Sequence, residues 1–243
     1  MLNQQSTSKV YPAIKEKLRP VHLPAPEITK ALAGLSADTA ATYLCQCVVD
    51  EDFTRRGREK AALIWLAMGL LVWTALNVSW GSVGTLGWPL FLVGPLLISL
   101  AVWLTQRRFG PLRDNALTGL TQVILDVHER ETLESLCEAT ALLNGGKRRW
   151  EVEIEIALRT TIARLLTRLS ADDAALLANP IREFLRIAIA DNRHTELTVA
   201  ALLTLGSARD EIALPHAETL RASLVENVRE AALEYIQELR GSA

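Results

Sequence analysis

The chain has 243 residues, a formal net charge of −2 and a hydrophobic content of 49%. These averages are those of an ordinary globular protein, but residues 61–106 contain no Asp, Glu, Lys, Arg or His. A run of 46 uncharged residues is difficult to bury in so small a core, which disfavours a fully soluble protein. The composition also disfavours disorder, a disulfide scaffold and a strongly basic nucleic-acid-binding protein.

Residues 1–35 are predicted to form a mostly irregular N-terminal arm. Four prolines interrupt its first 26 residues, and prolines without periodic apolar residues are typical of irregular structure. Tyr11, Ile14 and Leu18 are spaced for no more than one short helical turn.

Residues 36–60 are predicted to form an amphipathic helix followed by a basic juxtamembrane segment. Ser36 is a suitable N-cap residue, and the apolar residues after it recur at helical spacing. This apolar face requires a partner, either the C-terminal domain or lipid headgroups, and the acidic residues 50–52 favour a protein partner. The face consists of Ala40, Tyr43, Leu44, Cys47 and Val48.

Residues 61–106 are predicted to form a transmembrane helical hairpin with spans at 61–80 and 86–105. A helix of 20 residues is about 30 Å long, which matches the hydrocarbon thickness of a bilayer. The connector 81–85 is so short that the two helices must be antiparallel. Tryptophans lie in both spans, most of them toward the ends, as in interfacial aromatic belts; they are Trp65, Trp73, Trp80, Trp88 and Trp103.

Basic residues flank both predicted spans, whereas the connector carries no charge. Lys and Arg near the ends of a span favour the cytoplasmic side, so we expect an integral membrane protein with two spans and both termini in the cytoplasm. The Ala-, Leu- and Arg-rich composition suggests the bacterial inner membrane. The flanking residues are Arg55, Arg56, Arg58 and Lys60 before the first span, and Arg107, Arg108 and Arg113 after the second.

Residues 107–243 are predicted to form a cytoplasmic α-helical domain, which makes the whole chain all-α. Residues 150–156 alternate with a strand-like period, but no second strand is available, and Trp150, Ile154 and Leu158 share a helical face. Residues 110–243 carry a net charge of −6, which disfavours nucleic acid as a ligand. The predicted helices are 114–128, 130–144, 148–169, 171–178, 180–190, 194–206, 214–224 and 227–240.

The last helix contains Val228, Arg229, Ala231 and Ala232 in consecutive register. This pattern resembles the second helix of a HEAT-type repeat, V-R-x-A-A-x-x-L, although the final Leu is displaced to Tyr235 or Ile236. The resemblance implies a small α-solenoid of three or four helix pairs whose extended face binds another protein. A compact helical bundle of the same helices is the alternative.

The cysteines do not form a recognisable reactive or metal-binding motif. Cys45 and Cys47 point about 200° apart on a helix, and Cys137 is distant in sequence. We therefore expect three buried free thiols.

Other candidate sites also have structural explanations. None of His22, His128, His194 and His216 belongs to a metal-binding motif. The segment 145–149 lacks the strand and spacing of a phosphate-binding loop, and it is interpreted as a helix-ending turn with a basic face. The acidic pairs Asp172–Asp173 and Asp210–Glu211 lie at predicted helix starts, where the helix dipole favours them. No catalytic residue, cofactor-binding residue, metal ligand or cofactor is predicted.

These features together predict a non-enzymatic, membrane-anchored scaffold or adaptor that presents helical repeats to a cytoplasmic protein partner. The alternative is an accessory subunit of a channel, transporter or secretion apparatus, with the hairpin packed against other spans. A homo-oligomer is compatible with both. An enzyme with an unrecognised site among His128, His194 and nearby carboxylates is a third hypothesis.

Overall fold

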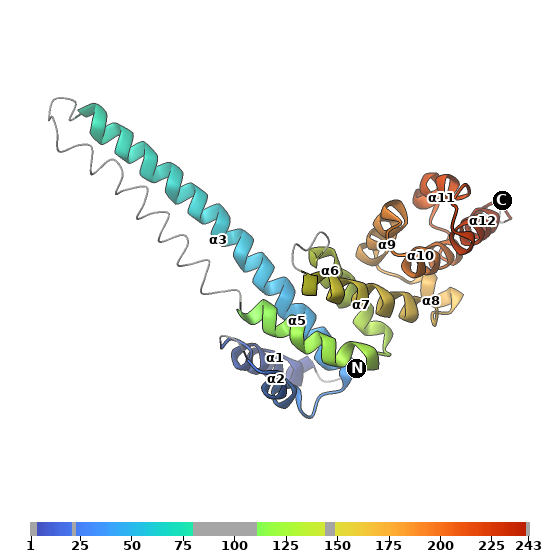
Figure 1. The fold of residues 1–243 in the computed structure, drawn as a ribbon, viewed down its shortest axis with the longest axis horizontal. Helices are drawn as coiled ribbons and strands as arrows, with labels where there is room; N and C mark the ends of the chain where they lie inside the picture. The colour runs from blue at the N-terminus through green and yellow to red at the C-terminus, as the bar shows by residue number, and fades with distance from the viewer. Residues whose placement is uncertain (1–3, 21–22, 80–110, 144–148, 242–243) are drawn as a thin grey trace.

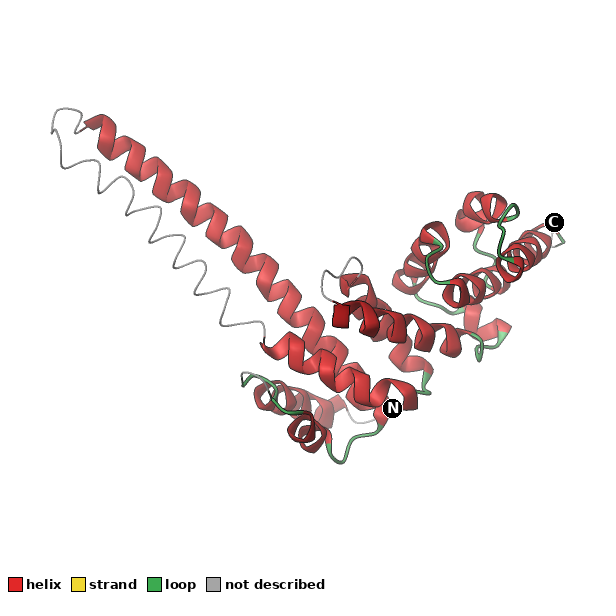
Figure 2. Ribbon diagram, in the orientation of Figure 1, coloured by secondary structure: helices red, strands yellow, loops and turns green. Residues whose placement is uncertain are grey.

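In the computed structural model, the described backbone comprises residues 4–20, 23–79, 111–143 and 149–241. Side chains are described from residue 10 onward. In the long third helix, the only side chains described beyond Gly57 are those of Lys60, Ile64 and Ala67. All regular structure in these ranges is helical, without a strand (Figure 2). This confirms the all-α prediction. The elements are α1 (Gln4–Lys17), α2 (Ala25–Leu32), α3 (Ala37–Ser79), α5 (Pro111–Val123), η1 (Ile124–Asp126), η2 (Arg130–Thr132), α6 (Leu133–Leu143), α7 (Arg149–Leu166), α8 (Ala171–Ala175), α9 (Asn179–Asp191), α10 (Thr195–Ser207), η3 (Glu211–Ala213), α11 (Leu214–Leu220) and α12 (Glu226–Arg240).

Helix α3 is the longest element and extends away from the other described helices (Figure 1). Its 43 residues correspond to about 65 Å at 1.5 Å per residue. The Ser36 hydroxyl accepts the backbone N–H of Thr39 at 3.2 Å, which confirms the predicted cap. The predicted apolar face is also confirmed, since Ala40, Tyr43, Leu44, Cys47 and Val48 are buried.

Helix α5 lies against the first part of α3, and α6 covers the same part. Gly119 permits the close approach of α5, because a methyl group there would meet Leu44 and Ile28 at 3.1 Å. The partner of the predicted apolar face is thus the helical domain of the same chain.

The expectation of a mostly irregular segment 1–35 is wrong, because this segment forms α1 and α2. Pro24 and Pro26 do not interrupt α2: they lie at its N-terminus, where a helix tolerates a missing N–H. Both helices also bury apolar residues against the body, which sequence periodicity alone did not indicate. These residues are Ile14, Leu18, Ile28 and Leu32.

The C-terminal half is built around α10, which contacts α7, α9 and α12. Gly206, the last residue of the predicted helix 194–206, lies in the last turn of α10. A methyl group there would meet the Glu238 carboxylate and approach Tyr235 of α12 at 3.4 Å. Segment 150–156 belongs to α7, as predicted, and Arg159 pairs with Glu155 at 2.8 Å. The other predicted helices are present with shifted or shortened ends.

Helix starts in the C-terminal half differ in how they are capped. Ser170 caps α8 by accepting the N–H of Asp173 at 3.2 Å. Asn179 and Asn227 have the residue type of a cap but do not act as caps, because α9 begins after Ala178 and α12 begins after Val225. In both cases the helix extends toward the N-terminus and includes the asparagine in its first turn.

The predicted hairpin falls largely outside the described residues. The backbone of residues 61–79 is the second part of α3, whereas span 86–105 is not among the described residues. Within the described set, no helix is both long and apolar enough to cross a membrane.

Candidate functional site

Helix α1 is attached to α3 by a polar cluster around Asp50. The Asp50 carboxylate accepts hydrogen bonds from the Tyr11 hydroxyl at 2.7 Å and the Lys15 ammonium at 2.5 Å. Burial opposes ionisation of Asp50, but these two bonds outweigh it and hold its pKa below the usual value. Burial and the bond to Asp50 raise the pKa of Tyr11. The ring of Tyr43 on α3 lies 5.8 Å from that of Tyr11 on α1. The cluster therefore joins α1 to α3 by an aromatic contact as well as by hydrogen bonds.

Two buried polar residues join α3 and α5 to segments that are distant in sequence. The Asp38 carboxylate accepts the backbone N–H groups of His128 and Glu129, both at 2.7 Å. The Asn115 amide donates to the carbonyls of Leu18 and Pro20, both at 2.9 Å. These contacts join residues 90 or more positions apart, and sequence reasoning missed them because no local pattern indicates them.

Beyond Asp50, the surface of α3 changes from buried and apolar to exposed and basic. Phe53 is 80% exposed, and the side chains of Arg55, Arg56 and Lys60 are also exposed. Arg56 forms an ion pair at 2.8 Å with Asp52, which is partly buried. The body of the protein ends at this level of α3, and Ile64, further along, is 63% exposed.

An ion pair joins the N-termini of α5 and α7. Arg113 of α5 binds Glu151 of α7 at 2.8 Å, and both side chains are largely buried. Arg149, two residues earlier, has a side chain that is 95% exposed and pairs with Glu153 at 3.2 Å. Trp150 is half-buried against the core.

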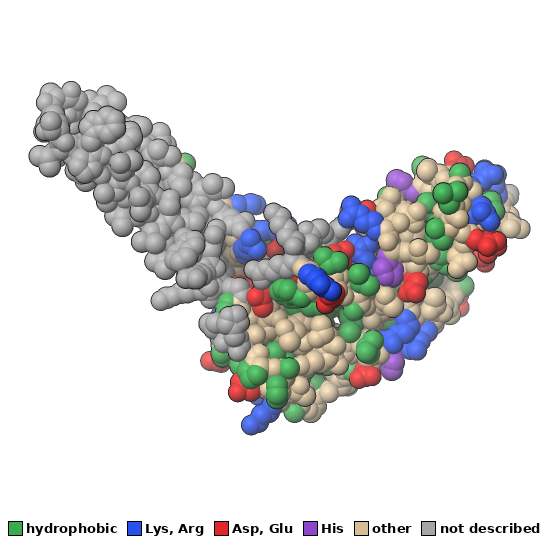
Figure 3. Space-filling view, viewed as in Figure 1, with side chains coloured by type: hydrophobic (Ala, Val, Ile, Leu, Met, Phe, Trp, Pro, Cys, Tyr) green, Lys and Arg blue, Asp and Glu red, His purple; other side chains and the backbone are tan. Residues whose placement is uncertain are grey.

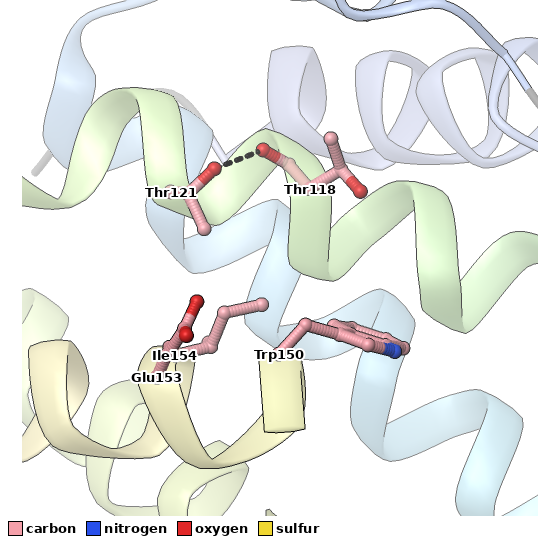
Figure 4. Close-up of a pocket in the computed structure, with 5 residues that line it drawn as sticks. All are labelled: Thr118, Thr121, Trp150, Glu153 and Ile154. Carbon is pink, nitrogen blue, oxygen red and sulfur yellow. Dashed lines mark hydrogen bonds between the residues drawn. The ribbon is translucent and has the colours of Figure 1, made fainter. Parts of the chain in front are cut away.

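An open surface pocket of about 300 Å³ lies between α5 and α7 (Figure 4). Thr118 and Thr121 form one side, and Trp150, Glu153 and Ile154 form the other. The Thr121 hydroxyl donates to the Thr118 carbonyl at 2.7 Å, and the Thr118 hydroxyl donates to the Asp114 carbonyl at 2.9 Å. With both hydroxyl protons engaged in the helix, this lining offers no nucleophile paired with a base.

The three cysteines are buried and free, as predicted. Cys47 faces Tyr11. Burial is the main cause that raises the pKa of Cys45 and of Cys137, with smaller contributions from Cys47 and Glu138 at Cys45 and from Cys45 and Glu134 at Cys137. Burial also raises the pKa of Cys47 to about 11. Thiols of this kind are protonated and therefore weak nucleophiles at neutral pH.

The described histidines lie in different places and take different roles. His194 caps α10 by accepting the N–H of Leu197 at 3.3 Å, and His128 contacts Arg168 at 3.3 Å. His216 is exposed, and His22 lies outside the described residues. Histidines appear as separate patches among mixed charges on the face in Figure 3. Among the described residues, no group of three or more His, Cys, Asp or Glu is arranged to hold a metal ion.

The two acidic pairs at helix starts differ in what holds them. Asp172 and Asp173 lie in the first turn of α8, as predicted, and Asp173 also pairs with Arg130. Asp210 is buried, and its carboxylate binds Arg186, with the Nε atom at 3.0 Å. The helix dipole alone therefore does not explain Asp210. The predicted turn at 145–149 lies outside the described residues except for Arg149.

Comparisons with protein-family models, curated proteins and solved structures found no match to this chain.

Proposed function

We propose that this protein is a membrane-anchored, non-enzymatic scaffold that holds a helical domain at the cytoplasmic surface of a membrane for a protein partner. In this proposal, residues 61–106 form a transmembrane hairpin and both termini lie in the cytoplasm. The proposal retains the HEAT-like helical pairs as the platform on which the partner binds.

The observation that carries the proposal is the continuity of α3. The same helix contains the buried residues Leu44 and Val48 and continues without a break to Ser79. Its last 19 residues contain no ionisable side chain, which suits hydrocarbon and is costly to leave in water. Because no flexible linker separates the two parts of α3, membrane insertion would hold the helical domain in a fixed orientation.

The exposed apolar side chains of the C-terminal half are candidates for the partner's binding face. Large exposed apolar residues lie just after α8, on α9 and η3, and in the turn before α12, on the half of the molecule away from α3 (Figure 1). Apolar residues in a polar surround are typical of protein-binding surfaces. They are Leu176, Ile187, Ile212 and Leu224.

Membrane extraction tests the anchor. We expect the full chain to remain with membranes after alkaline carbonate washing. Replacement of Leu66 and Leu70 by Arg adds about 3 kcal/mol each to insertion at mid-span and should release the protein. Leu176→Arg with Leu224→Arg is the matched control, since both side chains are exposed on the body, and this variant should stay in the membrane. Release of the unmodified chain would contradict the proposal.

Proximity labelling from the C-terminus of the full chain in its membrane tests the scaffold. We expect enrichment of a specific cytoplasmic protein, and loss of that enrichment when Leu176, Ile187 and Leu224 are replaced by Asp. Enrichment of membrane proteins alone, with crosslinks from Trp73 or Asn77, would favour the accessory-subunit alternative. Absence of any enriched protein would contradict both.

A further inference from the structure

The relative register of α3 and α5 shows which residues lie where α3 leaves the body. Asp38 binds the backbone at His128, after the end of α5, whereas Leu44 faces Gly119 within α5. The two helices therefore run antiparallel. Arg113, six residues before Gly119, lies about 9 Å further along the axis, which places it level with Asp50.

The ion pair between Arg113 and Glu151 then brings the first turn of α7 to the same level. Arg149 and Trp150 lie in that turn. Arg149 is separated by about 95 residues from the exposed residues Phe53 and Arg55 of α3, yet the ion pair of Arg113 with Glu151 brings it to the level at which α3 leaves the body. We call this set the basal surface: Phe53, Arg55, Arg56, Lys60 and Arg149.

Four acidic residues near the basal surface have identified partners. Asp50 is bound by Tyr11 and Lys15, and Glu151 is bound by Arg113. Asp52 and Glu153 pair with Arg56 and Arg149 of the basal surface itself; both partners of the second pair are exposed, whereas in the first pair Arg56 is exposed and Asp52 is partly buried. Exposed ion pairs contribute little free energy, so a phosphate group can replace the Glu153 carboxylate on Arg149.

We propose that the basal surface binds the headgroups of anionic phospholipids, which deepens the proposed function and rests on the membrane insertion of residues 61–106. Segment 53–60 contains four basic residues and one acidic residue. An exposed aromatic ring beside cations is the combination found at membrane interfaces, where the ring enters the headgroup layer and the cations meet phosphate. Phe53 therefore favours a lipid surface over a free phosphate ion, which would leave the ring in water.

The test uses the full chain in vesicles of phosphatidylcholine that contain a spin-labelled lipid, either phosphatidylglycerol or phosphatidylcholine. We expect the labelled phosphatidylglycerol to associate with the protein more strongly than labelled phosphatidylcholine. The variant Arg55→Glu with Arg149→Glu should reduce this preference by about fivefold per arginine. Arg240→Glu is the matched control, because Arg240 is exposed and paired with Glu218 at 3.6 Å on the C-terminal helix; it should leave the preference unchanged.

The outcomes separate the two proposals. A chain that stays inserted but shows equal association with both lipids would overturn the basal surface and leave the anchor intact. A chain that is released from the vesicles by carbonate would overturn the anchor itself. If Arg149→Gln, which removes the charge without reversing it, abolishes capture of a cytoplasmic protein and leaves the lipid preference intact, the occupant is a protein and the lipid assignment is wrong.

Discussion

The two parts of α3 have the same helical backbone but differ in the surroundings of their side chains. Residues 37–52 present one apolar stripe to the core, and the carboxylate of Asp38 joins this part to the segment after α5. Residues 61–79 are apolar on most sides according to the sequence and extend away from the body (Figure 1). The basic segment 53–60 lies between them. A single helix can therefore pass between two environments without a break, provided that its side chains change in polarity at the boundary.

The largest expected effect is the loss of unfolding free energy when a buried residue of α3 is truncated, compared with an exposed one. Leu44 is fully buried against α5, so Leu44→Ala should lower the free energy of unfolding by about 3 kcal/mol. Phe53→Ala should change it by less than about 0.5 kcal/mol, because the ring is 80% exposed. Denaturant unfolding of the full chain, followed by circular dichroism in detergent, measures both. Equal losses would show that the boundary near residue 53 is misplaced.

The second prediction concerns the attachment of α3 to the segment that follows α5. Asp38→Ala leaves the N–H groups of His128 and Glu129 without their acceptor, which should cost about 2–3 kcal/mol. Asp126→Ala is the control, since Asp126 is exposed. The same unfolding assay applies, and an Asp38 variant as stable as the control would contradict the role given to this carboxylate.

The third prediction compares a buried thiol of α3 with an exposed thiol in its basic segment. With its pKa raised to about 11, Cys47 should react with a maleimide at pH 8 about a hundredfold more slowly than an exposed thiol of ordinary pKa. A thiol introduced by Phe53→Cys provides that comparison on the same helix. Mass spectrometry of the native and denatured chain gives the rates. Rapid native labelling of Cys47 would mean that α1 does not cover this position.

The smallest expected effect is the pH dependence of α1. Because the folded-state pKa of Asp50 is lowered, its ionisation stabilises the folded state above the unfolded pKa of about 4. This stabilisation is lost as the pH falls through the lower folded-state value. It should be below about 1 kcal/mol, since the pair with Lys15 is partly exposed. Hydrogen exchange of α1 between pH 3 and pH 6 measures it. An Asp50→Asn chain should show no such acid-dependent release, and an unchanged profile would contradict this origin.

Much of the fold was predictable because its helices repeat apolar residues at helical spacing. The buried face of α3, the Ser36 cap and the helical state of segment 150–156 follow from local pattern. Helices α1 and α2 were missed, because their stability depends on packing against distant residues. Asp38 and Asn115 were missed for a related reason, since each acts on backbone groups that only the fold brings near.

The basal surface was only partly accessible from the sequence. The basic segment 53–60 was evident as a flank of the predicted span. The addition of Arg149 depends on the pair between Arg113 and Glu151, which joins residues of different helices and has no sequence motif. The hairpin itself stays a prediction from composition and length.

The most direct test of the central claim is the accessibility of the connector between the two predicted spans. A Ser82→Cys variant in intact cells should react with a membrane-impermeant maleimide from outside, whereas Leu224→Cys, on the exposed surface of the helical domain, should react only after permeabilisation. The native thiols are buried and give little background. Labelling of Ser82→Cys only after permeabilisation would contradict a hairpin that crosses the membrane and returns.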